Sequence, residues 1–218
     1  MKNTKSAEIK ALIFDLGGVM VNNSDPHVFR KMSKFFAVPL NLFETALKKN
    51  LKPYAEGRIN DKEFFEILAK ELGVLHKNSF SKYKKMMTDA YLASAKIDAN
   101  FLKFIKKLRK NYIIAALTNT IHLHERLNLK RKMFSHFDFA FRSNRLGMSK
   151  PYYTIGAKNP TRIYRHVCKK IHIEPKNCIF IDDMKPNLVP ARMLGMKTIH
   201  YKNYKQFLAE LKKLRIKI

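Results

Sequence analysis

Polar side chains follow three short apolar runs of the sequence, in each case at the point where the run ends. They are Asp15, Thr118 with Asn119, and Asp182 with Asp183. Continuous apolar runs of this length are typical of buried strands in a parallel sheet. Ligands bind beyond the carboxyl ends of such strands, so we expect these side chains to gather at one edge of the sheet.

This combination of groups suits the transfer of a phosphoryl group. The carboxylate of Asp15 can attack phosphorus in line and form an aspartyl-phosphate. Because that carboxylate and the phosphate repel each other, a cation must lie between them. Mg²⁺ prefers oxygen ligands and needs only one or two carboxylates besides phosphate and water, and Asp182 and Asp183 can supply them.

Three further side chains complete the predicted site. The hydroxyl of Thr118 and the amide of Asn119 can bind phosphate oxygens. Lys150, in the segment 147–151, can offset the negative charge that develops in the transition state. Each residue alone is weak support, because an Asp or Asn after a strand is more often a turn residue or a helix cap. Their occurrence together and in this order carries the prediction.

Strands that alternate with helices must position these groups. The predicted strands cover residues 11–14, 113–117 and 178–181, with weaker candidates at 137–141 and 197–201. Helical patterns between and after them cover residues 101–108, 187–194 and 204–211. The predicted fold class is therefore α/β, with a doubly wound parallel sheet.

The region from residue 25 to residue 94 interrupts this alternation with helical patterns only. Asn60 begins one of these helices, because Glu63 completes a capping box and apolar residues follow at helical spacing. The other predicted helices cover residues 28–37, 41–49 and 79–94. We therefore expect an inserted helical cap at residues 23–96 and a core formed by residues 1–22 and 97–218.

The chain of 218 residues is strongly basic, with 44 Lys and Arg against 17 Asp and Glu and a net charge of +27. Such a charge favours anionic partners, among them phosphate esters, nucleic acids and acidic lipids. The basic residues are spread along the whole chain, which favours a solvated basic surface over a dedicated binding face. The sequence contains no recognised nucleic-acid motif and no apolar stretch long enough to span a membrane.

The two cysteines, Cys168 and Cys178, lack the spacing of a zinc site and indicate a reducing compartment without a disulfide framework. We expect both to be core thiols. The apolar run after the N-terminus is interrupted by Asp15 and two glycines, which makes it a poor signal peptide. The expected location is the cytoplasm.

Four motifs, taken in order, resemble those of the haloacid dehalogenase-like hydrolase superfamily. They are residues 14–19 (Phe-Asp-Leu-Gly-Gly-Val), 117–119 (Leu-Thr-Asn), 149–151 (Ser-Lys-Pro) and 180–183 (Phe-Ile-Asp-Asp). The resemblance covers essentially the whole chain. It implies a Rossmann-like core, Mg²⁺ and hydrolysis through an aspartyl-phosphate. The insert resembles the small helical cap of that superfamily, and residues 54–60 are similar to caps of its sugar-phosphatase and epoxide-hydrolase N-domain-like branch.

Gly17 departs from the pattern of that superfamily. Most of its phosphatases carry a second Asp two residues after the nucleophile, as general acid and base. Gly17 can offer its backbone carbonyl to the metal but cannot protonate a leaving group. Because such help is worth ~10²–10⁴-fold in rate, its absence predicts a slow enzyme or a good leaving group, such as the sugar of an anomeric sugar phosphate.

The segment after Lys150 is a second departure. The superfamily usually runs from its lysine motif directly into a helix resembling residues 163–166, whereas residues 152–159 are extra here. Lys158 has the usual spacing to that helix, but Lys150 has the better local match, so we expect Lys150 to be the active-site lysine. We expect the extra residues to be a tolerated surface insertion, with a loop that reshapes the pocket as the second interpretation.

Two other functions are compatible with the sequence. Hydrolysis of a carbon–halogen bond also uses an Asp nucleophile but needs no metal, and the adjacent Asp182 and Asp183 favour the metal enzyme. A non-catalytic, basic nucleic-acid-binding protein on the same scaffold would account for the charge and for Gly17. The phosphate-handling residues, which are otherwise present, favour the phosphatase.

Other polar residues near the predicted site have weaker claims. Asn187 is expected mainly to start the helix after the acidic pair, with support of that pair as the second interpretation. His122 and His124 are expected mainly on the exposed surface of a helix, with contact to the substrate as the second interpretation.

Overall fold

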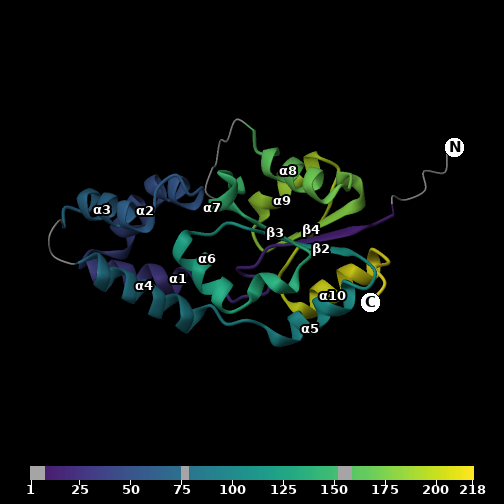
Figure 1. Ribbon diagram of the computed structural model, residues 1–218, viewed down its shortest axis with the longest axis horizontal. Coiled ribbons are helices and arrows are strands. Elements are labelled where there is room, and N and C mark those ends of the chain that lie inside the picture. Colours follow the sequence, from purple (N-terminus) through teal and green to yellow (C-terminus); the bar gives the residue numbers. More distant parts are fainter. Residues whose placement is uncertain (1–7, 75–78, 152–158) are drawn as a thin grey trace.

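The computed structural model describes residues 8–74, 79–151 and 159–218. At its centre lies a parallel sheet of five strands in the order β3-β2-β1-β4-β5 (Figure 1). The strands are β1 (Ala11–Phe14), β2 (Ile113–Thr118), β3 (Phe139–Arg142), β4 (Cys178–Asp182) and β5 (Lys197–His200). Because the first strand lies in the middle and the chain winds outward on both sides, the predicted doubly wound sheet is confirmed.

Successive side chains of each strand point to opposite faces of this sheet. Helices cover both of these faces. On one face, Phe14 of β1 makes edge-on ring contacts with Phe101 of α5 (Ala99–Leu108) and Phe207 of α10 (Tyr204–Lys213). On the other, Phe180 of β4 packs against Tyr164 of α8 (Arg162–Ile171), next to α9 (Lys185–Met193). The remaining core helices are α6 (His122–Lys130), α7 (Ser143–Leu146), η1 (Met133–His136) and η3 (Pro175–Asn177).

The three central strands end at the same level. Phe14 of β1 is the register partner of Ala116 in β2 and of Ile181 in β4. Asp15 and Asp182 therefore follow side by side beyond the apolar part of the sheet. The register brings the carboxyl ends of three strands to one edge, as the sequence predicted.

Four helices between β1 and α5 form the inserted cap. They are α1 (Asp25–Phe36), α2 (Leu40–Ala55), α3 (Asp61–Glu71) and α4 (Phe80–Ser94). Their shared core is aromatic, with Phe36 stacked on Phe43 and on Phe65. The predicted capping box is confirmed, because Asn60 accepts from the backbone of Glu63 while Glu63 accepts from the backbone of Asn60. No described helix is both long enough and apolar enough to cross a membrane.

The cap meets the core at a corner formed by residues 55–57 and 143–149. Ser143 donates from its hydroxyl to the carbonyl of Ala55 at 2.6 Å. Ser149 donates to the carboxylate of Glu56 at 2.9 Å. Gly57 has a positive φ of 69°, and a side chain there would collide with the backbone carbonyl of Asn144. Only a glycine allows the two backbones to approach this closely.

A second junction joins α4 of the cap to α6 of the core. The amide of Asn128 donates to the hydroxyl of Tyr91 at 2.8 Å. The ring of Tyr91 stacks on His124 with 3.9 Å between ring centroids. Arg126 of α6 also forms an ion pair with Asp61 of α3. The cap therefore rests on the core along the side of α6 as well as at the corner.

Candidate active site

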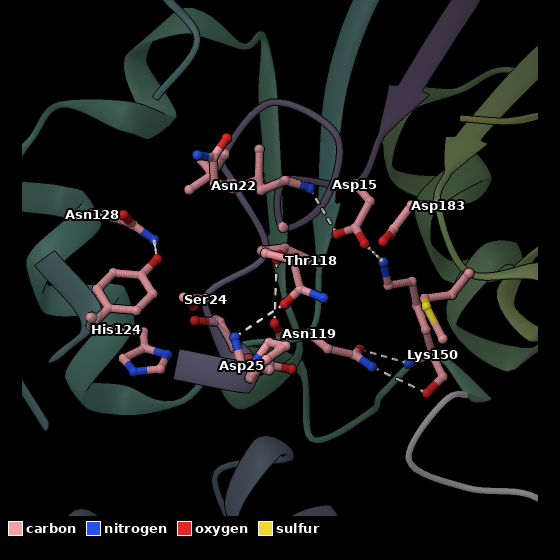
Figure 2. Close-up of a pocket in the computed structure, with 18 of the residues that line it drawn as sticks. Asp15, Asn22, Ser24, Asp25, Thr118, Asn119, His124, Asn128, Lys150 and Asp183 are labelled. Atoms are coloured by element: carbon pink, nitrogen blue, oxygen red, sulfur yellow. Dashed lines mark hydrogen bonds and ion pairs between the residues drawn. The ribbon is translucent and has the colours of Figure 1, made fainter. Parts of the chain in front are cut away.

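Asp15 lies immediately beyond β1 and is buried. Its backbone N–H donates to the carbonyl of Ile181 in β4 at 2.9 Å, which fixes the residue against the neighbouring strand. One carboxylate oxygen accepts the backbone N–H of Leu16 at 2.7 Å, and the other lies 2.7 Å from the ammonium of Lys150. The side chain is therefore held in one orientation, pointing into a cavity (Figure 2).

Asp182 and Asp183 follow β4 and lie beside Asp15. Ligand oxygens of the three carboxylates all lie within 4.8 Å of one another. Such a cluster of buried oxygen atoms is costly without a cation, and its spacing suits a hard ion such as Mg²⁺. The donor set therefore fits the predicted metal, and the structure brings together all three carboxylates that the sequence singled out.

Asn187 holds the buried carboxylate of Asp182 in place. Its side-chain amide donates to both carboxylate oxygens at 3.0 Å, and the backbone N–H of Met184 donates to one of them at 2.8 Å. The hydroxyl of Tyr164 in turn donates to the carbonyl of Asn187 at 2.7 Å. The helix begins at Lys185, so Asn187 lies in its first turn, close to the expected start, and its side chain supports the acidic pair as the second interpretation had it.

The two glycines after Asp15 differ in what surrounds them. Gly18 has a positive φ of 76°, and a side chain there would collide with the carboxylate of Asp183. It lets the loop after β1 lie directly against the loop after β4. Gly17 lines the cavity, and no atom lies within 4 Å of the position that its Cβ would occupy. Position 17 therefore has room for a side chain that the sequence does not supply.

Lys150 is almost completely buried and joins two of the carboxylates. Its ammonium lies 2.7 Å from an oxygen of Asp15 and 2.7 Å from an oxygen of Asp182. Asn119 secures the backbone of Lys150 on both sides, accepting its N–H at 2.8 Å and donating to its carbonyl at 3.2 Å. The structure thus places Lys150 at the predicted site and gives Asn119 a positioning role. Lys158 lies outside the described residues.

Burial and charge together set the protonation of this cluster. Burial raises the pKa of Asp15 to about 8; Lys150 opposes this shift and Asp182 adds to it. Burial also disfavours the charge on Lys150, but Asp15 and Asp182 outweigh it and hold the pKa of the ammonium above its usual value. Three carboxylates around one ammonium leave an excess of negative charge. Without a metal, the cluster therefore tends to bind a proton. A bound cation would favour release of that proton.

The cavity in front of Asp15 has a volume of about 310 Å³. Thr118, from the end of β2, lines the cavity together with Asn119. Lys150 and Asp183 lie on one side of the cavity and His124 lies on the opposite side (Figure 2). Residues of the cap close it, among them Asp25. The cavity enclosed in this way has room for a phosphate group and a small group attached to it.

A smaller chamber of about 70 Å³ extends from the cavity into the cap. The two spaces share the residues Asp25, Phe29, Asn119, Thr120 and His124. The other lining residues of the chamber are mostly apolar side chains of the cap helices. His124 was expected on the helix surface, but its Nε2 atom is buried without a hydrogen-bond partner among the described residues, so that expectation was wrong.

A family model for haloacid dehalogenase-like hydrolases matches residues 9–195, a range that includes every side chain of this cluster. The chain belongs to the haloacid dehalogenase-like hydrolase family. The predicted family is therefore confirmed, and with it the Rossmann-like core. The helical cap of this hydrolase is the insert between β1 and α5.

Several proteins similar to this haloacid dehalogenase-like hydrolase have described activities. Bifunctional epoxide hydrolase 2 of Sus scrofa is 28% identical over 94% of this chain, which spans only 39% of that protein. D-ribitol-5-phosphate phosphatase of Bacteroides thetaiotaomicron is 26% identical, over 93% of this chain and 97% of its own. A crystal structure of a HAD family enzyme from the same bacterium, in complex with magnesium and inorganic phosphate, has a TM-score of 0.73 and 25% identity. It covers 91% of this chain and 98% of the other.

Sequence patterns did not reveal the part of the site that the cap of this hydrolase contributes. Asp25, Glu44 and Tyr91 line the cavity, as does Asn128 at the junction of cap and core. None of them belongs to a motif, and each reaches the cavity only because the cap packs against α6. Pro26 marks the start of α1 in the sequence, but it gives no sign that Asp25 before it faces the cavity.

Proposed function

We propose that this hydrolase is a Mg²⁺-dependent phosphatase of small phosphate esters, with Asp15 as the attacking carboxylate. One observation carries the proposal. Asp15, Asp182 and Asp183 share one cation-sized space beyond the strand ends, and Lys150 lies within 2.7 Å of two of them. Similarity to a phosphatase along nearly the whole of both chains supports it.

The chain's own residues account for two chemical steps. In the first, a carboxylate oxygen of Asp15 forms a bond to phosphorus while the bond from phosphorus to the alcohol oxygen breaks, and the alcohol leaves with the electron pair. In the second, water attacks phosphorus, inorganic phosphate leaves and the carboxylate of Asp15 is restored. Because Gly17 supplies no acid, the departing alcohol takes its proton from solvent.

The neighbouring residues hold the reacting groups in place. Asp15, Asp182, Asp183 and the backbone carbonyl of Gly17 would hold Mg²⁺, which supplies positive charge between carboxylate and phosphate. Lys150 offsets negative charge on the phosphate oxygens. The hydroxyl of Thr118 donates to a phosphate oxygen.

The cap and the core have separate tasks in this proposal. We assign residues 1–22 and 97–218 to the core that performs the chemistry, and residues 23–96 to a cap that contacts the leaving group. The support is that Asp25, Phe29 and Glu44 of the cap line the cavity, while the carboxylate cluster belongs to the core. A sugar is a suitable leaving group, because departure of an anomeric oxygen needs less acid assistance.

Metal removal distinguishes this proposal from carbon–halogen hydrolysis. The protein is expected to hydrolyse p-nitrophenyl phosphate with Mg²⁺, to lose turnover in EDTA and to regain it when Mg²⁺ is restored. With 2-chloropropionate no chloride release is expected. Chloride release that is unaffected by EDTA would establish the dehalogenase instead. RNA binding that weakens steeply with salt, combined with no Mg²⁺-dependent turnover, would favour the basic nucleic-acid-binding protein.

The affinity for Mg²⁺ is expected to rise between pH 6 and pH 8 and to level off above that range. Burial holds the pKa of Asp15 at about 8, so below that pH the metal must displace a proton. Each pH unit of protonation weakens apparent binding by up to ~10-fold. Calorimetric titrations in buffers of different ionisation enthalpy would measure both the affinity and the released proton. An affinity that is constant from pH 6 to pH 8 would contradict the raised pKa.

A further inference from the structure

The cavity at the carboxylate cluster has a charge opposite to that of the whole molecule. The chain carries 44 Lys and Arg against 17 Asp and Glu. Among the described residues that line the cavity, Lys150 is the one lysine or arginine. The acidic residues of the lining are Asp15, Asp25, Glu44 and Asp183. The cavity is therefore an acidic site in a strongly basic protein.

Lys150 serves the phosphate end of the cavity and leaves the rest without a cation. Its ammonium is 2.7 Å from both Asp15 and Asp182. Figure 2 shows it on the side of Asp183, whereas His124 and Asn128 lie at the opposite side. His124 supplies no charge there, because burial lowers its pKa to about 3. A second anionic group on a substrate would therefore find no described cation in the lining.

Asp25 and Glu44 add negative charge to this cation-free part. Both belong to the cap, and neither carboxylate forms an ion pair or a hydrogen bond with another described residue. Carboxylates elsewhere do have such partners, as Asp138 has in Arg109. Burial, and to a smaller extent Asp183, raises the pKa of Asp25 to about 6, so this carboxyl is mostly ionised at pH 7.

The other groups around the cavity are uncharged. The polar ones are Asn22, Asn23, Ser24, Tyr91, Thr118, Asn119, Thr120 and Asn128. The chamber behind them is lined mainly by apolar side chains, such as those of Met32, Leu47 and Phe64. A negatively charged group placed in either space would lose hydration without gaining an ionic partner. A hydroxyl group, by contrast, could donate to a free carboxylate and accept from an amide.

We propose that Asp25 and Glu44 make this site select phosphate monoesters whose alcohol part bears hydroxyl groups and no second anionic group. They exclude substrates that carry a second phosphate or a carboxylate. The inference rests on the proposed phosphatase function and specifies the class of its substrate. Specificity here arises partly from repulsion of the wrong substrate, since like charges held close together in a confined site repel each other.

Three five-carbon phosphates, compared by kcat/KM with Mg²⁺, test the proposal. All three are esters of a primary alcohol and share the same kind of leaving group, and the pentitol 5-phosphate is expected to be the best of the three. The pentonate 5-phosphate differs from it by a carboxylate in place of the terminal hydroxymethyl group, and we expect its kcat/KM to be lower by ~10²-fold or more. Pentyl phosphate, which has no hydroxyl groups, is expected to be lower by about 10-fold. Values for the pentonate within about threefold of the pentitol would overturn the charge selection, and a pentyl ester as good as the pentitol would overturn hydroxyl recognition.

Two nearly isosteric variants connect the selection to its residues. In Asp25→Asn and Glu44→Gln the ratio of pentitol to pentonate kcat/KM is expected to fall by about 10-fold each. The ratio compares two substrates in one protein, so a partial loss of folded protein does not affect it. Glu66→Gln, an exposed cap residue outside the cavity, is the matched control and should keep the wild-type ratio. An unchanged ratio in both cavity variants would overturn the assignment.

A binding measurement keeps the two proposals distinguishable. If p-nitrophenyl phosphate shows no Mg²⁺-dependent turnover, the phosphatase function fails, and calorimetry of the pentitol and pentonate phosphates with Mg²⁺ still measures selection. Tighter binding of the pentitol by ~10²-fold would support the neutral-ligand site without catalysis. Equal affinities for the two compounds would overturn it.

Discussion

Replacement of Asp15 by Asn is expected to reduce kcat on p-nitrophenyl phosphate by about 10⁴-fold or more, the scale seen when a covalent nucleophile is removed. The amide keeps the size of the side chain but can neither attack phosphorus nor carry charge to the metal. The expected loss is far larger than that of a binding residue, because in the proposed mechanism Asp15 itself forms the bond to phosphorus. Initial rates at saturating Mg²⁺ would measure it.

The same substitution is expected to leave the fold intact. Burial raises the pKa of Asp15, which shows that the folded protein disfavours the charge at this position. A neutral amide removes that cost, and Lys150 keeps its ion pair with Asp182. The metal-free variant should therefore unfold at a temperature no lower than that of the metal-free wild type. Asp89→Asn, on the exposed surface of α4, is the control and should retain full activity. Folded Asp15→Asn protein with more than about 1% of wild-type kcat would exclude Asp15 as the nucleophile.

The second large effect is a gain of activity. Gly17→Asp is expected to raise kcat on alkyl phosphates by about 10- to 100-fold. General acid–base catalysis typically raises a rate by ~10²–10⁴-fold, so this gain reaches at most the lower end of that range. Position 17 lines the cavity, is not among the glycines with positive φ, and has no atom within 4 Å of the point where a Cβ would lie. An aspartate can therefore enter without displacing a neighbour and can protonate the departing alcohol.

Gly17→Asn separates proton transfer from simple filling of space. It has nearly the same shape but no proton to give, so we expect no gain from it. The gain in Gly17→Asp should be larger for an alkyl phosphate than for p-nitrophenyl phosphate, whose leaving group needs little protonation. A new limb should also appear in the pH profile of kcat. Equal activity of the Asp and Asn variants would show that the missing acid does not limit the reaction.

The strand ends were predictable from sequence because short-range patterns determine them. A buried strand in a parallel sheet is apolar throughout, so the polar residue after it marks its carboxyl end. This reasoning predicts Asp15, Asp182 and Asp183 at one edge of the sheet, where the structure has them. The helix predicted at 41–49 in fact runs from Leu40 to Ala55 through Pro53. Stacking of Tyr54 on Phe64, with 4.0 Å between ring centroids, supports the final turn that the proline weakens.

The wall of the cavity was not predictable in the same way. Asp25, Glu44 and His124 enter it because of how the cap packs against the core, and no local pattern encodes that packing. Asn187 shows what the sequence does and does not predict. The position of its helix was readable from the sequence, whereas the hydrogen bonds from its side chain to Asp182 depend on the bend after β4. The cytoplasmic location and the nucleic-acid alternative stay predictions, because neither follows from the fold.

The corner at residues 55–57 has a consequence for substrate entry. Gly57 and Asn144 meet through backbone atoms, so there is no side chain at this point that could be shortened or rotated to relieve a tighter fit. Any larger residue at position 57 would act as a spacer that tilts one unit away from the other. A larger residue at position 57 is thus expected to alter the opening between cap and core, and with it substrate access, while leaving every lining side chain the same.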